Sequence, residues 1–186
     1  MITSNKMGFQ VINKEAIITR VREAMGQYKN IVISGEEGVG KITNTLEALH
    51  DADNVYYIGN PVDYVGKPRP KGYDKYINYI TSRKKDMHII AGEKELLSFD
   101  PASLPEKELV LVIDEIYGRS EEQYERIIRF LQVEKAKVFL ITGCLKNIGR
   151  IVQGIDVGLM LTKDGVILFD REFAIKICSV LSPEPV

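Results

Sequence analysis

Residues 30–43, NIVISGEEGVGKIT, decide the fold of this chain. The first five of them form a short apolar run rich in β-branched side chains, which is typical of a buried strand in a parallel sheet. A glycine-rich segment follows, and a helix is expected from about Gly40 to Leu49. A strand that leads through a glycine-rich turn into a helix predicts an α/β protein whose ligand lies at that turn.

The glycine-rich turn matches the pattern G-x-x-x-x-G-K, which is typical of phosphate-binding loops. Glycines let the backbone curl so that successive N–H groups point at phosphate oxygens, and the following helix presents its positive end to the same anion. Lys41 can bridge the β- and γ-phosphates as a mobile cation. The residues predicted to bind the nucleotide are Gly35, Glu36, Glu37, Gly38, Val39, Gly40, Lys41, Ile42 and Thr43.

Position 42 departs from the pattern. The residue after the lysine is usually serine or threonine, whose hydroxyl ligates Mg²⁺, and here it is Ile42. Thr43 supplies a hydroxyl one position later, but one helical step turns it by about 100°. Thr43 is therefore a candidate magnesium ligand, while Ile42 favours an alternative in which the chain binds nucleotide with little or no hydrolysis.

Residues 109–115, LVLVIDE, form an apolar run that ends in two carboxylates. Asp114 is expected to hold Mg²⁺ through its water, and Glu115 to orient and deprotonate an attacking water. Because adjacent residues on a strand point in opposite directions, the two carboxylates can serve different tasks. Both motifs lie at the carboxyl ends of predicted strands, where the ligand crevice of a parallel sheet lies.

Apolar runs and capping residues predict the other elements. Helices are expected at about residues 14–28, 74–83, 121–133, 147–155 and 171–181, further strands at 55–58 and 137–142, and a hairpin at 157–169. Because strands alternate with helices, the predicted fold is α/β, with a mostly parallel sheet, helices on both faces and a C-terminal β-hairpin. One domain is expected over residues 1–186, with its core at about 14–170.

Over that core the chain resembles the P-loop NTPases of the additional-strand, catalytic-glutamate class, which includes the AAA+ and RecA-like ATPases. The two motifs above correspond to the Walker A and Walker B motifs of that family. The resemblance implies that Lys41 contacts the phosphates, that Asp114 serves magnesium and that Glu115 is the general base. It also implies a polar residue at the end of the next strand that touches the γ-phosphate, for which Thr142 is the best match, with Asn147 as a second candidate.

Two parts of the family pattern have no clear counterpart. Only a single short helix follows the hairpin, which leaves no room for the family's helical lid. Arg150 and Arg119 lie where an arginine finger could stand, and both are interpreted as solvated surface residues.

Residues 64–85 carry seven lysines and arginines against one aspartate, with four interleaved tyrosines. Cations that neutralise phosphates and aromatic faces that stack on bases are typical of a surface that binds single-stranded nucleic acid. The alternative is a solvated loop and an amphipathic helix whose tyrosines pack inward. The segment 64–66, Tyr-Val-Gly, also resembles the pore loop of AAA+ unfoldases.

Composition limits the remaining classes of function. The 186 residues are 45% hydrophobic and 27% charged with a net charge of −1, which argues against a general nucleic-acid or membrane-surface binder. No apolar run approaches the roughly 20 residues that cross a bilayer. Cys144 and Cys178 form no metal or disulfide pattern and are expected to be small core residues in a reducing, cytoplasmic compartment.

The sequence therefore predicts an ATP-binding protein, with Mg²⁺ as its second cofactor, that hydrolyses ATP slowly. The preference for adenine comes from the family resemblance only. Expected partners are the nucleotide, a single-stranded nucleic acid or a protein that binds residues 64–85, and other copies of the chain in a homo-oligomer.

Overall fold

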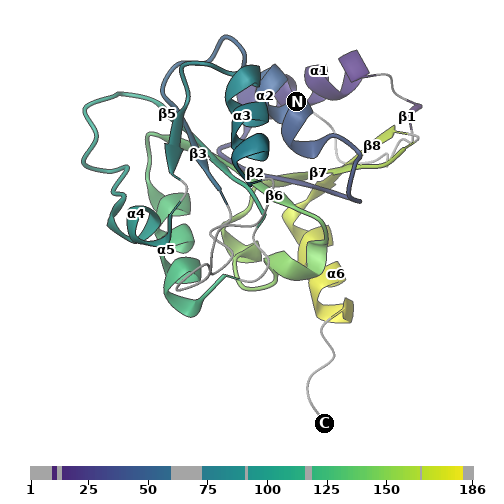
Figure 1. Cartoon of the computed structure of the whole chain (residues 1–186). Helices are drawn as coiled ribbons and strands as arrows, with labels where there is room; N and C mark the ends of the chain where they lie inside the picture. Colours follow the sequence, from purple (N-terminus) through teal and green to yellow (C-terminus); the bar gives the residue numbers. More distant parts are fainter. Residues whose placement is uncertain are drawn as a thin grey trace.

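The structure is a computed structural model that describes residues 10–11, 14–59, 73–90, 92–115, 119–163 and 165–181. Within these residues the strands form one eight-stranded sheet in the order β1-β8-β7-β2-β6-β5-β3-β4 (Figure 1). The strands are β1 (Gln10–Val11), β2 (Asn30–Gly35), β3 (Val55–Ile58), β4 (His88–Ile90), β5 (Leu109–Ile113), β6 (Ala136–Thr142), β7 (Val157–Leu161) and β8 (Gly165–Asp170).

The sheet is mostly parallel, as predicted. Strand β2 lies between β6 and β7 and is parallel to both, and β5 is parallel to β6 on its other side. One strand, β6, therefore separates the glycine-rich strand β2 from the acidic strand β5. Strands β7 and β8 pair antiparallel and form the predicted C-terminal hairpin.

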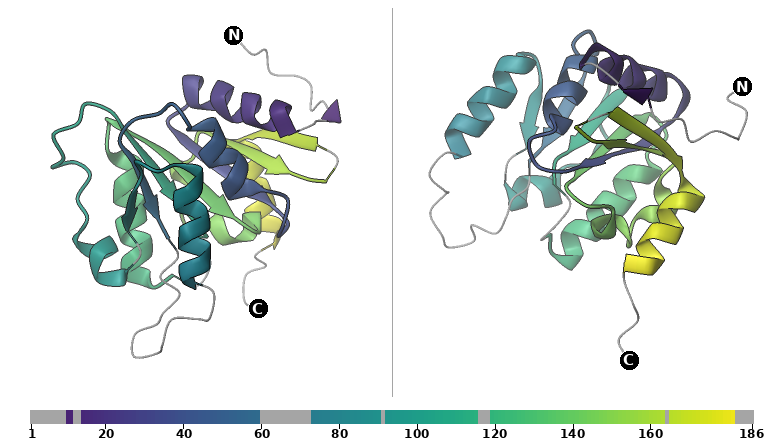
Figure 2. Two further views of the ribbon diagram at one scale, coloured as in Figure 1. Left: turned by 45° about the horizontal axis from the view of Figure 1, so that its top comes forward. Right: turned by 90° about the vertical axis from the view of Figure 1, so that its right-hand side faces the viewer.

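Helices cover both faces of the sheet (Figure 2). They are α1 (Lys14–Gln27), α2 (Lys41–Ala48), α3 (Tyr73–Arg83), α4 (Glu93–Ser98), α5 (Glu121–Gln132) and α6 (Arg171–Leu181). Side chains that alternate along β2 divide between the layers, because successive residues of a strand point to opposite faces. Ile31 and Ile33 pack in the cluster that contains α1, α2 and α3, whereas Val32 packs in the cluster that contains α4, α5 and α6.

Two predictions about the segment after β6 were wrong. Residues 147–155 were expected to be one helix, but the segment forms two 3₁₀ turns, η1 (Leu145–Ile148) and η2 (Val152–Gly154). Gly149 and Gly154 lie in this segment, and glycine disfavours a continuous helix. Cys144 was expected in the core, but it is exposed because it follows the carboxyl end of β6, whereas Cys178 is buried.

Some elements of the structure were not predicted, and some predictions lie outside the described residues. Helix α4 and the two-residue strand β1 were not predicted. Asn13 as a helix cap, residues 64–72 of the basic segment and Asp164 of the hairpin turn fall outside the described residues. Among the described residues, the structure contains no helix that is long and apolar enough to cross a membrane.

Candidate functional site

The glycine-rich turn joins β2 to α2 in a backbone conformation that favours glycine. Gly35, Gly38 and Gly40 have φ angles of 145°, 82° and 84°. A Cβ atom on Gly35 would lie 2.3 Å from the Leu161 carbonyl oxygen, and one on Gly40 would lie 2.9 Å from Nδ2 of Asn44. Left-handed backbone and close neighbours together explain why the turn needs glycine at both ends.

Lys41 is the first residue of α2, and its side chain lies back across the turn. Its Nζ atom donates to the carbonyl oxygens of Gly35 and Glu36, at 2.8 Å each. The ammonium group is therefore held at the turn by neutral acceptors. A phosphate would be a stronger partner, since hydrogen bonds between ionised groups are roughly twice as strong as neutral ones.

The side chains at 42 and 43 point to different surroundings. Ile42 is partly buried and packs against the apolar cluster between the sheet and helices α1 to α3. The Thr43 hydroxyl lies 2.7 Å from the Tyr79 hydroxyl on α3. Thr43, a candidate metal ligand, is thus already hydrogen-bonded to a neighbouring helix.

Asp114 follows β5, and one of its carboxylate oxygens is bound by two tyrosines. Tyr57 on β3 donates to Oδ2 at 2.5 Å, and Tyr76 on α3 donates to the same atom. Burial and the nearby carboxylate of Asp114 raise the pKa of both hydroxyls, so the two tyrosines remain donors. No residue in the described part of the chain donates to Oδ1 of Asp114.

Glu115 turns toward β6 instead. Its φ angle of 43° is uncommon for a residue other than glycine, and it redirects the chain at the end of β5. Oε2 of Glu115 accepts from the backbone N–H of Gly143 at 3.3 Å, and Oε1 lies 3.5 Å from the Thr142 hydroxyl. The two adjacent carboxylates therefore face different neighbours.

Thr142 ends β6 and is fully buried beside Glu115. Its hydroxyl donates to the Cys144 carbonyl oxygen at 3.0 Å and accepts from Nδ2 of Asn147 at 3.3 Å. Thr142 is also the register partner of Ser34, the residue before Gly35. The pairing of β2 with β6 thus brings the glycine-rich turn and the Glu115 carboxylate to one edge of the sheet.

Arg119 is buried, which corrects the prediction that it is a solvated surface residue. Its Nη2 atom donates to the carbonyl oxygens of Gly59 and Asp114 at 3.2 Å and 2.9 Å, and its Nε atom donates to that of Glu115 at 3.2 Å. Burial lowers its pKa to about 10. The arginine satisfies backbone carbonyl oxygens that follow β3 and β5, where no described strand pairs with them. Arg150, in contrast, is exposed, as predicted, and it pairs with Glu121.

Two buried polar atoms near this edge have no hydrogen-bond partner in the described part of the chain. They are Oγ of Ser34 and Nη1 of Arg119. Buried polar groups are nearly always paired, so such atoms commonly mark a position for a ligand or a water molecule.

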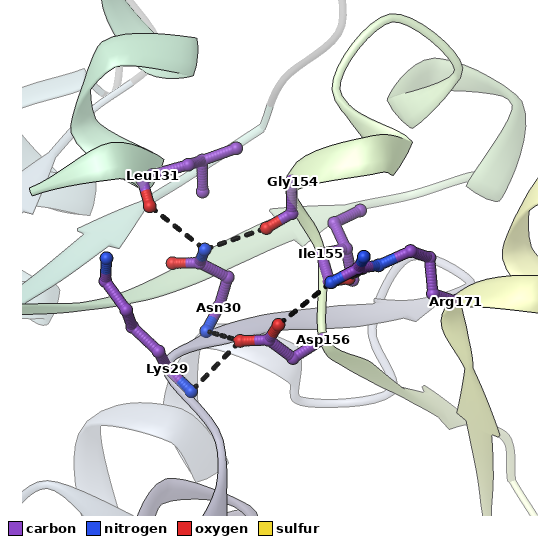
Figure 3. A network of polar contacts seen from close by, with 7 residues as sticks. All are labelled: Lys29, Asn30, Leu131, Gly154, Ile155, Asp156 and Arg171. Atoms are coloured by element: carbon purple, nitrogen blue, oxygen red, sulfur yellow. Dashed lines mark hydrogen bonds and ion pairs between the residues drawn. The ribbon is translucent and has the colours of Figure 1, made fainter. Parts of the chain in front are cut away.

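The opposite, amino edge of the sheet carries a polar network in which one buried atom, Oδ1 of Asn30, has no hydrogen-bond partner among the described residues (Figure 3). Oδ2 of Asp156 accepts from the backbone N–H groups of Lys29 and Asn30 at 3.2 Å and 2.9 Å, and Oδ1 pairs with Arg171 at 3.1 Å. Nδ2 of Asn30 donates to the carbonyl oxygens of Leu131 and Gly154 at 3.1 Å and 2.8 Å. A shallow hollow of about 650 Å³ adjoins this network. Its polar lining residues include Asp156 and Arg171, which bind one another.

Sequence reasoning missed three residues that contact the acidic pair: Tyr57, Tyr76 and Arg119. Tyr57 carried a signal, since residues 55–58 read VYYI and alternation places one tyrosine on each face of the sheet. The contacts of Tyr76 and Arg119 depend on the docking of α3 and on the turn after Glu115, which no local pattern specifies.

No family model matches this chain, and neither does any curated protein. Among solved structures, the large terminase of a thermophilic bacteriophage in complex with ADP matches with a TM-score of 0.48 and 12% identity. The alignment covers 80% of this chain and 44% of the terminase. The VirB11 ATPase from the Brucella suis type IV secretion system, in complex with sulphate, matches with a TM-score of 0.43 and 15% identity over 89% of this chain and 55% of that protein. The chain thus spans about half the length of these two structures. Both TM-scores lie below 0.5.

Proposed function

We propose that the chain is a P-loop protein of the additional-strand, catalytic-glutamate class that binds ATP with Mg²⁺ and hydrolyses it slowly. The observation that carries this proposal is the turn between β2 and α2, which contains three glycines with positive φ and holds the Lys41 ammonium group against the carbonyl oxygens of Gly35 and Glu36. The position of β6 between β2 and β5 supports the class, since the additional strand of that class separates the same two motifs.

The donor set fits a nucleotide with magnesium. The backbone of residues 35–41 and the Lys41 ammonium group would bind the phosphates, and the unpaired Ser34 hydroxyl lies directly before this turn. Mg²⁺ is usually held in nucleotide sites by one or two carboxylates together with water and phosphate oxygens. Asp114, with one oxygen free of described donors, suits that role, and Thr43 is the second candidate ligand. Bound magnesium would neutralise charge on the phosphates.

Glu115 would orient the attacking water and accept its proton. The backbone N–H of Gly143 and the nearby Thr142 hydroxyl restrict the rotation of its side chain. The family resemblance assigns contact with the γ-phosphate to Thr142, but its hydroxyl is buried in this structure and donates to the Cys144 carbonyl oxygen. A positioned base typically contributes about 10²- to 10⁴-fold in rate.

The second candidate is a nucleotide-responsive binding protein with little turnover, and the packing of Ile42 favours it. Ile42 places an apolar side chain in the core at the position where related loops present a hydroxyl to the metal. Nucleotide binding through the backbone and Lys41 does not require that hydroxyl, whereas hydrolysis depends on the position of the metal.

We infer that a nucleic acid or protein partner binds the exposed part of residues 73–85, and that the chain can form a homo-oligomer. Lys75, Arg83 and Lys85 are exposed there, and Tyr76 and Tyr79 are each 38% exposed. Lys84 does not contribute, since it is buried and donates to the His50 carbonyl oxygen and to Asp86.

Titration of the purified chain with ATP, GTP and ADP, with Mg²⁺ and with EDTA, tests the proposed function. A nucleotide at 100 times its Kd should stabilise the fold by about 2.7 kcal/mol, which a shift in melting temperature reports. Lys41→Met should abolish most of this shift. Lys94→Met removes an exposed lysine of α4 and should leave it unchanged. Wild-type protein that shows no shift with any of the three nucleotides would disprove the proposal.

Phosphate release separates the two candidate functions. Steady release that requires Mg²⁺ supports the hydrolase. Nucleotide-dependent stabilisation without phosphate release, at every protein concentration tested, supports the binding protein.

A further inference from the structure

Helix α3 connects the two halves of the candidate site. Its Tyr79 hydroxyl meets Thr43 of α2, just beyond the glycine-rich turn and its lysine, and its Tyr76 hydroxyl meets Asp114 beyond β5. These two tyrosines are three positions apart and therefore lie on the same side of the helix. The helix thus touches both candidate magnesium ligands through hydroxyl groups.

The two tyrosines at Asp114 come from different parts of the fold. Tyr57 belongs to β3 and is fully buried, so its hydroxyl is fixed by the sheet. Tyr76 belongs to α3 and is 38% exposed, so its hydroxyl depends on where the helix lies. Both donate to Oδ2, and the two hydroxyl oxygens are 3.3 Å apart.

A carboxylate whose Oδ2 atom accepts two hydrogen bonds has lost most of its freedom to rotate. The other oxygen, Oδ1, receives no donor from the described residues and is left for a metal ion or its water. Outer partners that orient a metal-binding carboxylate typically change metal affinity by about 10- to 100-fold when they are removed.

We propose that Tyr57 and Tyr76 are positioning residues for magnesium, holding Oδ2 of Asp114 so that Oδ1 serves the ion. This inference rests on the proposed function. Through Tyr76, the position of α3 sets the Mg²⁺ affinity of the nucleotide complex, and a partner that binds the exposed face of α3 acts on the metal rather than on the phosphates.

The measurement is the Mg²⁺ concentration that gives half of the magnesium-dependent gain in ATP affinity, followed with a fluorescent ATP analogue. Hydrolysis is blocked by Glu115→Gln in every variant. Tyr57→Phe and Tyr76→Phe each remove one hydroxyl. Each should raise the Mg²⁺ midpoint about 10-fold, while nucleotide affinity in EDTA stays within twofold.

Tyr56→Phe is the matched control. Tyr56 is the neighbour of Tyr57 on β3, but it packs against the other face of the sheet, and its hydroxyl lies 3.3 Å from Oε1 of Glu106. Tyr56→Phe removes a tyrosine hydroxyl from the same strand as Tyr57→Phe does, but this hydroxyl does not contact Asp114. The Mg²⁺ midpoint should not change in this variant.

A double-mutant cycle with Asp114→Asn shows whether Tyr76 acts through Asp114. Once Asp114 no longer binds the ion, adding Tyr76→Phe should shift the midpoint no further. An additive shift overturns the inference, and so does an unchanged midpoint in both single tyrosine variants. A lower midpoint in Tyr76→Phe also overturns it, because the hydroxyl would then compete with magnesium.

The failure of the inference and that of the proposed function are distinguishable. Wild-type protein that binds no nucleotide in either buffer overturns both. Wild-type protein that binds ATP with a magnesium-dependent gain, together with tyrosine variants that match it, overturns the inference alone.

Discussion

Asp156 at the amino edge of the sheet and Asp114 at the carboxyl edge differ in how many of their carboxylate oxygens the described residues use. At the amino edge, both carboxylate oxygens of Asp156 are used, one by two backbone N–H groups and the other by Arg171 (Figure 3). At the carboxyl edge, two tyrosines bind one oxygen of Asp114, and no described residue donates to the other. The first arrangement is complete within the protein, whereas the second leaves an acceptor for a ligand.

The arginines of the two edges differ in the same way. Arg171 is half exposed and binds a carboxylate and the Ile155 carbonyl oxygen. Arg119 is buried, binds only carbonyl oxygens among the described residues, and has no described partner for Nη1. The hollow of about 650 Å³ adjoins the amino edge, where Oδ1 of Asn30 also lacks a partner among the described residues. The hollow therefore does not coincide with the candidate site, which is defined by the glycine-rich turn and the two carboxylates after β5.

The largest expected effect is on hydrolysis, at Glu115. Glu115→Gln keeps the shape of the side chain and its acceptor for the Gly143 N–H, but it removes the basic oxygen. Phosphate release should fall by about 10²- to 10⁴-fold. ATP affinity, measured by titration, should stay within twofold. Unchanged phosphate release would show that Glu115 takes no part in hydrolysis and only stabilises the fold, as Asp156 does at the amino edge.

Substitution of Asp156 should reduce the stability of the protein and leave nucleotide binding unchanged. Asp156→Ala leaves the N–H groups of Lys29 and Asn30 without their acceptor, and the side chain is only 31% exposed. The free energy of unfolding should fall by about 2 kcal/mol, the usual scale for unpaired buried donors. Urea denaturation measures this loss, and ATP affinity of the folded protein should not change.

Asp114→Asn is the counterpart of that change at the carboxyl edge. The asparagine retains an acceptor oxygen for the tyrosine hydroxyls, so stability should stay within about 0.5 kcal/mol, as for changes that keep buried groups paired. The Mg²⁺ midpoint of ATP binding should rise by more than it does in either tyrosine variant, and it remains measurable because the phosphates still bind the ion. If Asp156→Ala and Asp114→Asn affect the same property, the distinction between the two edges is wrong.

The fold followed from the sequence where local patterns determine it. The apolar strands, the glycine turn and the acidic strand end are short-range signals, and each strand predicted at residues 30–34, 55–58, 109–113 and 137–142 is present. The hairpin was also predicted, from the turn residues that separate its two apolar runs. Glycines at 149 and 154 divided the helix expected after β6, which shows how local composition can end an element.

Long-range contacts could not be predicted in the same way. Arg119 looked like a surface residue because arginine is usually exposed, and only the assembled ends of β3 and β5 supply the carbonyls that bury it. Tyr76 looked like part of a basic, aromatic surface, yet its hydroxyl meets Asp114, 38 positions away in the chain. The identity of the carboxylates was therefore readable from the sequence, while the groups that orient them were not.

Gly40 offers a smaller test at the carboxyl edge. Gly40→Ala places a Cβ atom 2.9 Å from Nδ2 of Asn44 on a residue with a φ of 84°. It should destabilise the protein by about 1–2 kcal/mol. Gly26→Ala is the control, because Gly26 lies within α1 and a Cβ there meets nothing within 4 Å. That change should stabilise the protein by about 0.5–1 kcal/mol, as expected for alanine in a helix. Urea denaturation of both variants would reveal whether the turn needs glycine, and equal effects would contradict the claim.

The smallest expected effect concerns Ile42, which decides between the two proposed functions. Ile42→Thr places a hydroxyl at the position that serves the metal in related loops, at the cost of apolar contacts with the α1–α3 cluster. Ile42→Val makes the matched control, because valine has the shape of threonine without the hydroxyl. The threonine variant should lower the Mg²⁺ midpoint for ATP binding by about threefold relative to valine, which corresponds to about 0.7 kcal/mol. If magnesium placement limits turnover, phosphate release should also be faster in the threonine variant than in the valine variant. If the two variants match in both measurements, residue 42 does not approach the metal, and the slow hydrolysis that we propose must have another cause.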